Sequence, residues 1–220
     1  MTPEFFNNEK VHIQSLIEKY QVSKDLQVLD IGCSDFKPYS EFVASHFSRY
    51  TGVDIDEKAL EISREKSGKY PNARIEFGSA ENLDFPDDSF DLVIFNNAVA
   101  YTDKLKSYSE AYRVLKPKGL LLSCFNNTIE YSFYKLLHPM KPLLIEWGHT
   151  FVVILNTWIY SIFGCKIFRT TFNTRKELDA IIRSLGADLK EIEVENKTHP
   201  YRVINLVAEK GASNRNVTSG

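Results

Sequence analysis

Short apolar runs alternate with segments of helical spacing along most of this chain. Residues 27–32 form an apolar run that a glycine ends, which is typical of a parallel strand buried on both faces. Similar runs recur up to residue 125, and most of them are followed by apolar positions at helical spacing. The pattern predicts strands at 27–32, 50–54, 74–77, 90–95 and 119–125, and helices at 3–20, 38–47, 57–68 and 103–115.

The C-terminal part of the chain predicts one more helix and two strands. We expect a helix at 174–185 that Thr174 caps and Gly186 ends, then strands near 188–195 and 201–209. The link between these two strands is short enough for an antiparallel hairpin, whereas a parallel crossover needs about a dozen residues or more. The predicted fold class is therefore α/β, with a mostly parallel seven-stranded sheet, an antiparallel terminal hairpin and helices on both faces.

Residues 127–170 interrupt the alternation and are rich in aromatic and aliphatic side chains. We interpret them as a helical insertion, a lid after the fifth strand. The apolar run at 151–163 is too short to cross a bilayer, which takes about twenty apolar residues. A longer segment that starts at Leu143 would include the polar residues Glu146 and His149. A membrane-spanning helix is not predicted. A helical cap on the sheet is the preferred interpretation, and peripheral bilayer contact or a dimer surface are the alternatives.

The length of 220 residues fits one domain with room for this insertion. We expect a single domain over 1–210 with an N-terminal helix within 1–22, and a disordered polar tail at 211–220. The formal net charge is −2 with both signs interspersed, which disfavours nucleic acid as a partner and favours a small-molecule substrate. The three cysteines lie far apart, so no metal site or disulfide framework is predicted. The N-terminus lacks the pattern of a secretory signal, and a cytoplasmic location is expected.

Candidate ligand-binding residues lie where the first two predicted strands end. Gly32 follows the first strand, where a residue without a side chain lets the backbone approach a ligand closely. Asp54 ends the second strand 22 residues later, at a spacing that suits a pair of ribose hydroxyls. A dinucleotide site requires further glycines, but Ser34 and Lys37 occupy those positions. The residues therefore favour a nucleoside without phosphates.

Five segments in order, within residues 28–125, resemble the motifs of class I, Rossmann-like S-adenosylmethionine-dependent methyltransferases of the small-molecule "type 11" group. The terminal helix and hairpin also match the layout of that family. The resemblance implies a methyltransferase with S-adenosyl-L-methionine as cofactor. The five segments are VLDIGCS (28–34), GVDID (52–56), FGSAENLDFP (77–86), SFDLVIFN (89–96) and RVLKPKG (113–119).

The resemblance also implies roles for individual residues. Asp30 and Gly32 are expected near the methionine part of the cofactor, with Asn96 beside it. Asp54 is expected to hold the ribose, and Ser79 to border the adenine. The full candidate set for cofactor binding is Asp30, Gly32, Ser34, Asp54, Ile55, Ser79, Ala80 and Asn96.

The chain departs from the family pattern at three positions. Ser34 and Phe36 stand where the family often has glycines, so we expect the loop to follow a somewhat different path. Ser79 stands where an aspartate is common, and a hydroxyl is a weaker acceptor than a carboxylate. These departures affect how tightly and in which orientation the cofactor is expected to bind, but they do not change which cofactor the resemblance implies.

Methyl transfer depends mainly on alignment of the two reactants, which can contribute about 7–11 kcal/mol. A general base helps but is not obligatory. The candidate catalytic residues are His149 in the insertion and Tyr101 after the fourth strand, with His138 as a weaker candidate.

Three function classes follow from the sequence. The leading one is methyl transfer to a small apolar or aromatic acceptor, at oxygen in preference to nitrogen or carbon. The second is a catalytically inactive cofactor-binding protein of the same fold with a regulatory or scaffold role. The third, an oxidoreductase, is disfavoured by the single loop glycine and the terminal hairpin.

Overall fold

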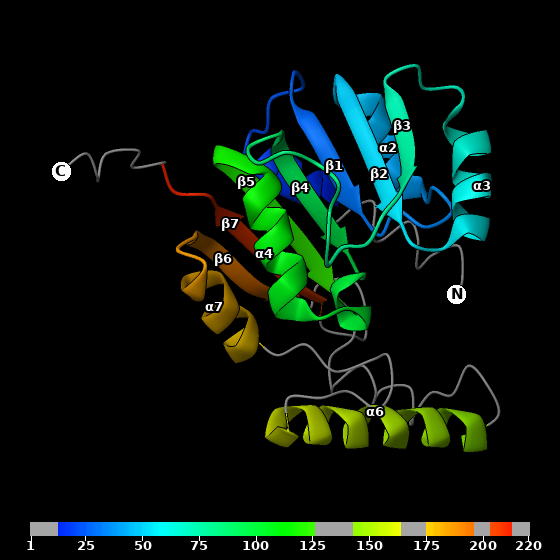
Figure 1. Cartoon of the computed structure of the whole chain (residues 1–220), viewed down its shortest axis with the longest axis vertical. Coiled ribbons are helices and arrows are strands. Elements are labelled where there is room, and N and C mark those ends of the chain that lie inside the picture. The colour runs from blue at the N-terminus through cyan, green and yellow to red at the C-terminus, as the bar shows by residue number, and fades with distance from the viewer. Residues whose placement is uncertain (1–12, 126–142, 164–174, 196–202, 213–220) are drawn as a thin grey trace.

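A seven-stranded sheet in the order β3-β2-β1-β4-β5-β7-β6 organises the molecule (Figure 1). The computed structural model describes residues 13–125, 143–163, 175–195 and 203–212. Strands β1 to β5 pair in parallel, while β7 is antiparallel to both β5 and β6. The predicted sheet and its terminal hairpin are confirmed. The strands are β1 (Gln27–Ile31), β2 (Arg49–Asp54), β3 (Ala73–Phe77), β4 (Phe90–Asn96), β5 (Leu115–Phe125), β6 (Asp188–Glu195) and β7 (Val203–Glu209).

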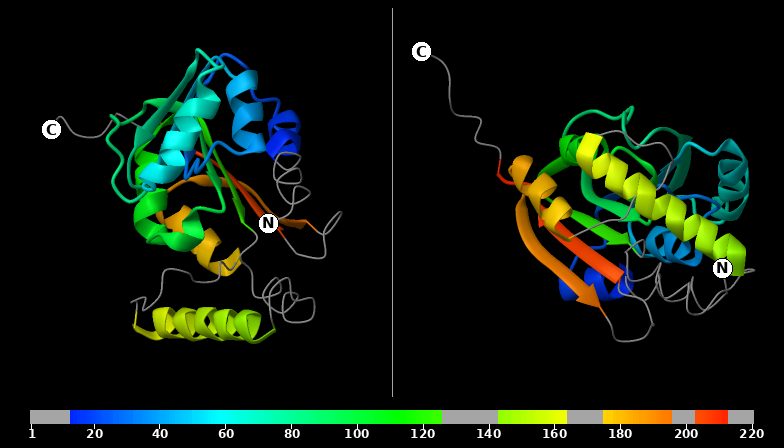
Figure 2. Two further views of the ribbon diagram at one scale, coloured as in Figure 1. Left: turned by 90° about the vertical axis from the view of Figure 1, so that its right-hand side faces the viewer. Right: turned by 90° about the horizontal axis from the view of Figure 1, so that it is seen from below.

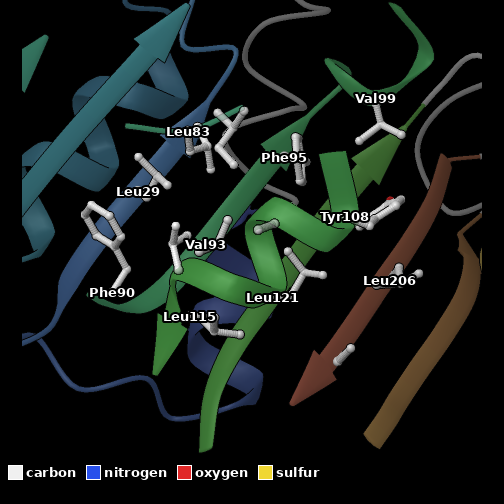
Figure 3. Close-up of a cluster of buried hydrophobic side chains, with 14 of the residues drawn as sticks. Leu29, Leu83, Phe90, Val93, Phe95, Val99, Tyr108, Leu115, Leu121 and Leu206 are labelled. Carbon is white, nitrogen blue, oxygen red and sulfur yellow. The ribbon is translucent and has the colours of Figure 1, made fainter. Parts of the chain in front are cut away.

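Helices cover both faces of the sheet, and each face has its own hydrophobic core. On one face, helix 13–19 and α2 contribute Ile13, Leu16 and Val43 to a cluster that also contains residues of β1, β2, β4, β5 and β7. On the other, α4 and α7 contribute Tyr108 and Leu178 to a second cluster (Figure 3). The described helices after residue 19 are α2 (Pro38–His46), α3 (Glu57–Ser67), the short 3₁₀ helix η1 (Val99–Tyr101), α4 (Lys104–Val114), α6 (Leu143–Phe163) and α7 (Arg175–Ser184).

Local sequence signals account for most element boundaries. The Asp56 carboxylate caps α3 by accepting the backbone N–H groups of Lys58 at 3.1 Å and Ala59 at 3.4 Å. Gly186 follows α7 with φ of +70°, as expected for a helix-ending glycine. One boundary was predicted wrongly, because β5 begins at Leu115 and not at Gly119. Residues 116–118, between the predicted helix and the predicted strand, lie inside β5, where the pairing with β4 shifts register.

The strand order reverses direction between β1 and β4, so these two strands flank the switch point of the sheet. The loops that follow β1, β2, β3 and β4 all emerge at the carboxyl edge of the parallel strands. In Figures 1 and 2, α6 lies beyond this edge, apart from the layered body. Candidate ligand contacts therefore gather on the side of the molecule that carries α6.

Several sequence predictions fall outside the described residues. They concern His138, Thr174, the start of the N-terminal helix, the parts of the insertion on either side of α6, and most of the tail. Among the helices that the structure describes, none has the length and apolar character needed to cross a membrane.

Candidate nucleoside site at the carboxyl edge of the sheet

The loop after β1 passes very close to the end of β4. Gly32 has φ of +81°, and a Cβ atom at this position would lie 2.4 Å from the Cβ of Ala98. The N–H groups of Gly32 and Cys33 both donate to the carbonyl of Val53, at 2.7 and 3.1 Å. The loop is thus fixed between β2 and β4, with bare backbone at the point of closest approach.

Ser34 and Phe36 lie in the loop after β1, and the expected difference between its path and that of the family stays a prediction. Their φ angles are +52° and +55°, so both side-chain-bearing residues adopt the left-handed conformation that glycine favours. Phe36 is buried and packs edge-on against Tyr50, with ring centroids 5.7 Å apart. Such a conformation costs a non-glycine residue about 1–2 kcal/mol. The packing of Phe36 helps to offset this cost.

Asp54, at the end of β2, is oriented by two backbone groups. Its Oδ2 accepts the N–H of Ser34 at 2.9 Å, and its Oδ1 accepts the N–H of Asp56 at 3.0 Å. The carboxylate is only partly buried, so it keeps accepting capacity for a ligand. The neighbouring Ile55 is largely exposed. The structure therefore brings Gly32, Ser34 and Asp54 together, as the sequence predicted.

Asp30 lies behind this loop and is completely buried. Its Oδ1 accepts the hydroxyl of Tyr39 at 3.1 Å, and its Oδ2 accepts those of Ser40 at 3.0 Å and Tyr50 at 2.6 Å. Burial raises the pKa of Asp30 to about 6, although the three hydroxyl groups oppose the rise. Asp30 thus links β1, α2 and β2 from within. No local pattern predicts its three hydroxyl partners, because they are nine to twenty residues away.

The loop after β3 carries Ser79 and Ala80. The Ser79 hydroxyl accepts the N–H of Glu81 at 3.2 Å, and Ala80 packs against the core on the α4 side. Glu81 in turn accepts the N–H of Asp103 at 2.8 Å, which ties this loop to the start of α4. The Ser79 side chain therefore helps to shape the loop.

Two residues of α4 hold the next part of this loop. Glu110 accepts the N–H of Leu83 at 2.8 Å. Arg113 donates to the carbonyl groups of Leu83 at 2.9 Å and Phe85 at 2.7 Å, and it also pairs with Glu110. The hydrogen bonds from Arg113 lower the pKa of Glu110. Helix α4 thus fixes the backbone beside the candidate adenine contacts, a role that the sequence did not reveal.

The last elements of the edge follow β4. Asn96 is nearly buried, and the next residue, Asn97, has φ of +60° and donates its N–H to the carbonyl of Cys124 at 2.8 Å. Tyr101, in η1, is largely exposed. His149 belongs to α6, but its side chain is outside the described residues. The proposed catalytic pair thus remains a prediction.

This edge has the chemical character of a nucleoside site. It combines the oriented carboxylate of Asp54 with the exposed apolar side chains of Ile55, after β2, and Phe77, which ends the adjacent strand β3. A carboxylate can accept two ribose hydroxyl groups, and apolar surface suits the faces of a purine. The close approach at Gly32 leaves backbone where the rest of a nucleoside ligand would extend. The oriented carboxylate and the apolar surface fit a nucleoside better than a pyrophosphate.

Sequence comparisons show that the chain is similar to methyltransferases. Residues 29–123 match the sequence model of a family described as "Methyltransferase domain". The demethylmenaquinone methyltransferase of Staphylococcus epidermidis is 33% identical over 139 residues, which is 61% of this chain and 57% of that protein. The chain therefore spans little more than half the length of the curated relatives it matches.

Solved structures extend the likeness to nearly the whole chain. A SAM-dependent methyltransferase from Methanosarcina mazei superposes with a TM-score of 0.67 at 20% identity, covering 90% of this chain and 98% of that one. Magnesium protoporphyrin IX methyltransferase from Synechocystis, solved with bound SAH (S-adenosylhomocysteine), gives a TM-score of 0.66 at 15% identity, covering 93% and 83%. At these identities the likeness shows a shared fold.

We predict that Gly32→Ala destabilises the protein by about 2–4 kcal/mol, from the positive φ and from the clash with Ala98. Denaturant unfolding measures this loss. Adding Ala98→Gly to the first change removes the clash but keeps the φ cost, so the double variant should recover part of the stability. Equal loss in the single and double variants would show that Ala98 does not limit the approach.

We also predict a pH-dependent contribution from Asp30. Because its pKa is raised in the folded state, the folded protein binds the extra proton, and stability falls as pH rises from about 4 through 6. Relative to Asp30→Asn, the wild type should lose about 2 kcal/mol between about pH 4.5 and pH 7.5. Denaturant unfolding of both proteins at the two pH values measures the difference. A difference that does not change with pH would contradict the raised pKa.

Proposed function

We propose that this chain carries a class I, Rossmann-like S-adenosylmethionine-dependent methyltransferase domain and that it transfers a methyl group to a small aromatic acceptor of the quinone class. The proposal rests mainly on one observation. The Asp54 carboxylate is oriented by the loop after β1, at the switch point of a methyltransferase fold. The family matched by residues 29–123 supports the same reaction.

In this proposal the residues at the carboxyl edge bind and orient the cofactor. Asp54 accepts the ribose hydroxyl groups, with Ile55 beside them, and Gly32 gives the methionine part access to the backbone. Asn96 borders the methionine part, and Ser79 and Ala80 border the adenine. Ser34 positions Asp54 through its N–H. Asp30, which we expected near the methionine part, is completely buried and bonded to three hydroxyl groups, so here it supports the loop from behind. S-adenosylmethionine supplies a methyl group activated by a sulfonium sulfur, so the chain's main task is alignment.

The acceptor half of the proposal rests on the insertion and on the relatives. The relatives are named for a demethylated menaquinone, and residues 127–170 offer apolar and aromatic side chains for such a ring. Helix α6 lies on the side of the sheet where the methyl group would be transferred (Figure 1). A quinol ring offers hydroxyl oxygens and an activated ring carbon. The sequence analysis favours oxygen as the acceptor atom. Identifying the methylated product distinguishes methylation at oxygen from methylation at the ring carbon.

We expect Asp54→Asn to weaken binding of S-adenosylhomocysteine by about 1.5–3 kcal/mol, because one acceptor of charge-assisted hydrogen bonds is lost. Titration calorimetry measures this affinity. Asp56→Asn is the matched control, since it removes the same charge two residues away and leaves an α3 cap. Equal affinity losses in both variants would place the ribose elsewhere.

We expect the protein to methylate a short-chain demethylmenaquinone analogue reduced to its quinol, with mass spectrometry and NMR identifying the product. His149→Gln and Tyr101→Phe should each lower kcat by about 100-fold or more if they assist proton removal, with unchanged affinity for S-adenosylhomocysteine. Full turnover in both variants would exclude these residues as catalytic. Tight cofactor binding without turnover of any aromatic acceptor would favour the inactive, regulatory alternative.

A further inference from the structure

Helix α6 exposes an apolar stripe. At 100° per residue, the five large apolar side chains of α6 that the structure describes as exposed fall within an arc of about 100° on one side of the helix. Phe151 is 66% exposed and Trp158 is 60% exposed. We call this set the α6 stripe: Phe151, Ile154, Leu155, Trp158 and Ile162.

The opposite side of α6 is buried and more polar. Thr150, Val153 and Asn156 are buried there, and their positions centre on the direction opposite to the stripe. A helix that only caps a core buries its apolar side and exposes its polar side. Helix α6 does the reverse, so its outer side is built for an apolar partner.

The sequence around α6 has a charge unlike that of the rest of the chain. Residues 131–176 contain six lysine or arginine residues and one glutamate, whereas the remaining residues contain 21 basic and 28 acidic ones. Within this segment, Lys141 precedes α6 by two residues and Lys166 follows it by three. Arg175 and Lys176, at the start of α7, are exposed. Basic residues are attracted to an anionic surface, and exposed apolar side chains are stabilised in an apolar interior. A partner with both properties therefore complements this segment.

We propose that the α6 stripe docks this protein on the surface of an anionic lipid bilayer. The helix lies in the plane of the interface, with its apolar stripe among the acyl chains and the exposed Arg175 and Lys176 near the headgroups. Trp158 suits this depth, because an indole ring prefers the boundary between headgroups and hydrocarbon. Crossing the bilayer is not involved, since α6 lacks the required apolar character.

Docking would place the candidate site against the membrane. Helix α6 lies beyond the carboxyl edge of the parallel strands, so a surface that covers its stripe lies on the same side as the site (Figures 1 and 2). An acceptor dissolved in the bilayer could then reach the site without crossing water. This consequence rests on the proposed function, but the docking itself does not.

Vesicle co-sedimentation tests the docking. The wild type should bind vesicles of phosphatidylcholine with phosphatidylglycerol at least about 10-fold more tightly than vesicles of phosphatidylcholine alone. Phe151→Ser with Trp158→Ser should reduce that binding at least about 10-fold. The control, Ile62→Ser with Leu105→Ser, removes two exposed apolar side chains from α3 and α4 and should bind like the wild type. Affinity for S-adenosylhomocysteine is measured in parallel, so failure of docking is distinguished from failure of the proposed function.

A second measurement avoids changing the stripe. The chain has two tryptophans, so Trp147→Phe leaves Trp158 as the reporter, and its emission should shift to shorter wavelength with anionic vesicles. No shift and no co-sedimentation would overturn the proposal. Equal binding to neutral and anionic vesicles would overturn its electrostatic part. A lipid-free dimer in analytical ultracentrifugation that the stripe variant dissociates would assign the stripe to a second copy of the chain instead.

Discussion

The close approach of β1 and β4 at Gly32 and Ala98 is the constraint on which the site depends. No side chain fits between these two positions, so the loop after β1 runs directly against the end of β4. That path brings the Ser34 N–H to Asp54 and requires positive φ angles at Ser34 and Phe36. One steric contact at the switch point thereby determines the orientation of the carboxylate.

Short-range patterns in the sequence predicted the sheet, the hairpin and the proximity of Gly32 to Asp54. They did so because strand periodicity, a loop glycine and a short link each have a local physical cause. The three hydroxyl partners of Asp30 and the contacts of Arg113 with the loop after β3 were not predicted. They join residues that only the tertiary fold brings together, up to 30 residues apart. Which side of α6 is exposed was equally inaccessible, since helical periodicity does not say what a helix packs against.

The two halves of the candidate site are built differently. The cofactor half is supported by buried groups and by the hydrogen bonds that α4 makes to the loop after β3, which keep its backbone in place. The acceptor half involves α6, which lies apart from the layered body and exposes its apolar stripe (Figure 1). A cofactor half held by buried groups and a separate, apolar acceptor half allow one fold to combine the same cofactor with different acceptors.

The carboxyl edge at β1 to β4 is suited to a nucleoside thioether and not to a dinucleotide. Calorimetric titration of the full chain with S-adenosylhomocysteine and, separately, with NADH tests this most directly. The account predicts saturable one-to-one binding of S-adenosylhomocysteine and no heat with NADH, because the loop after β1 offers a single glycine where a pyrophosphate needs more bare backbone. Tight NADH binding with no response to S-adenosylhomocysteine would contradict the account.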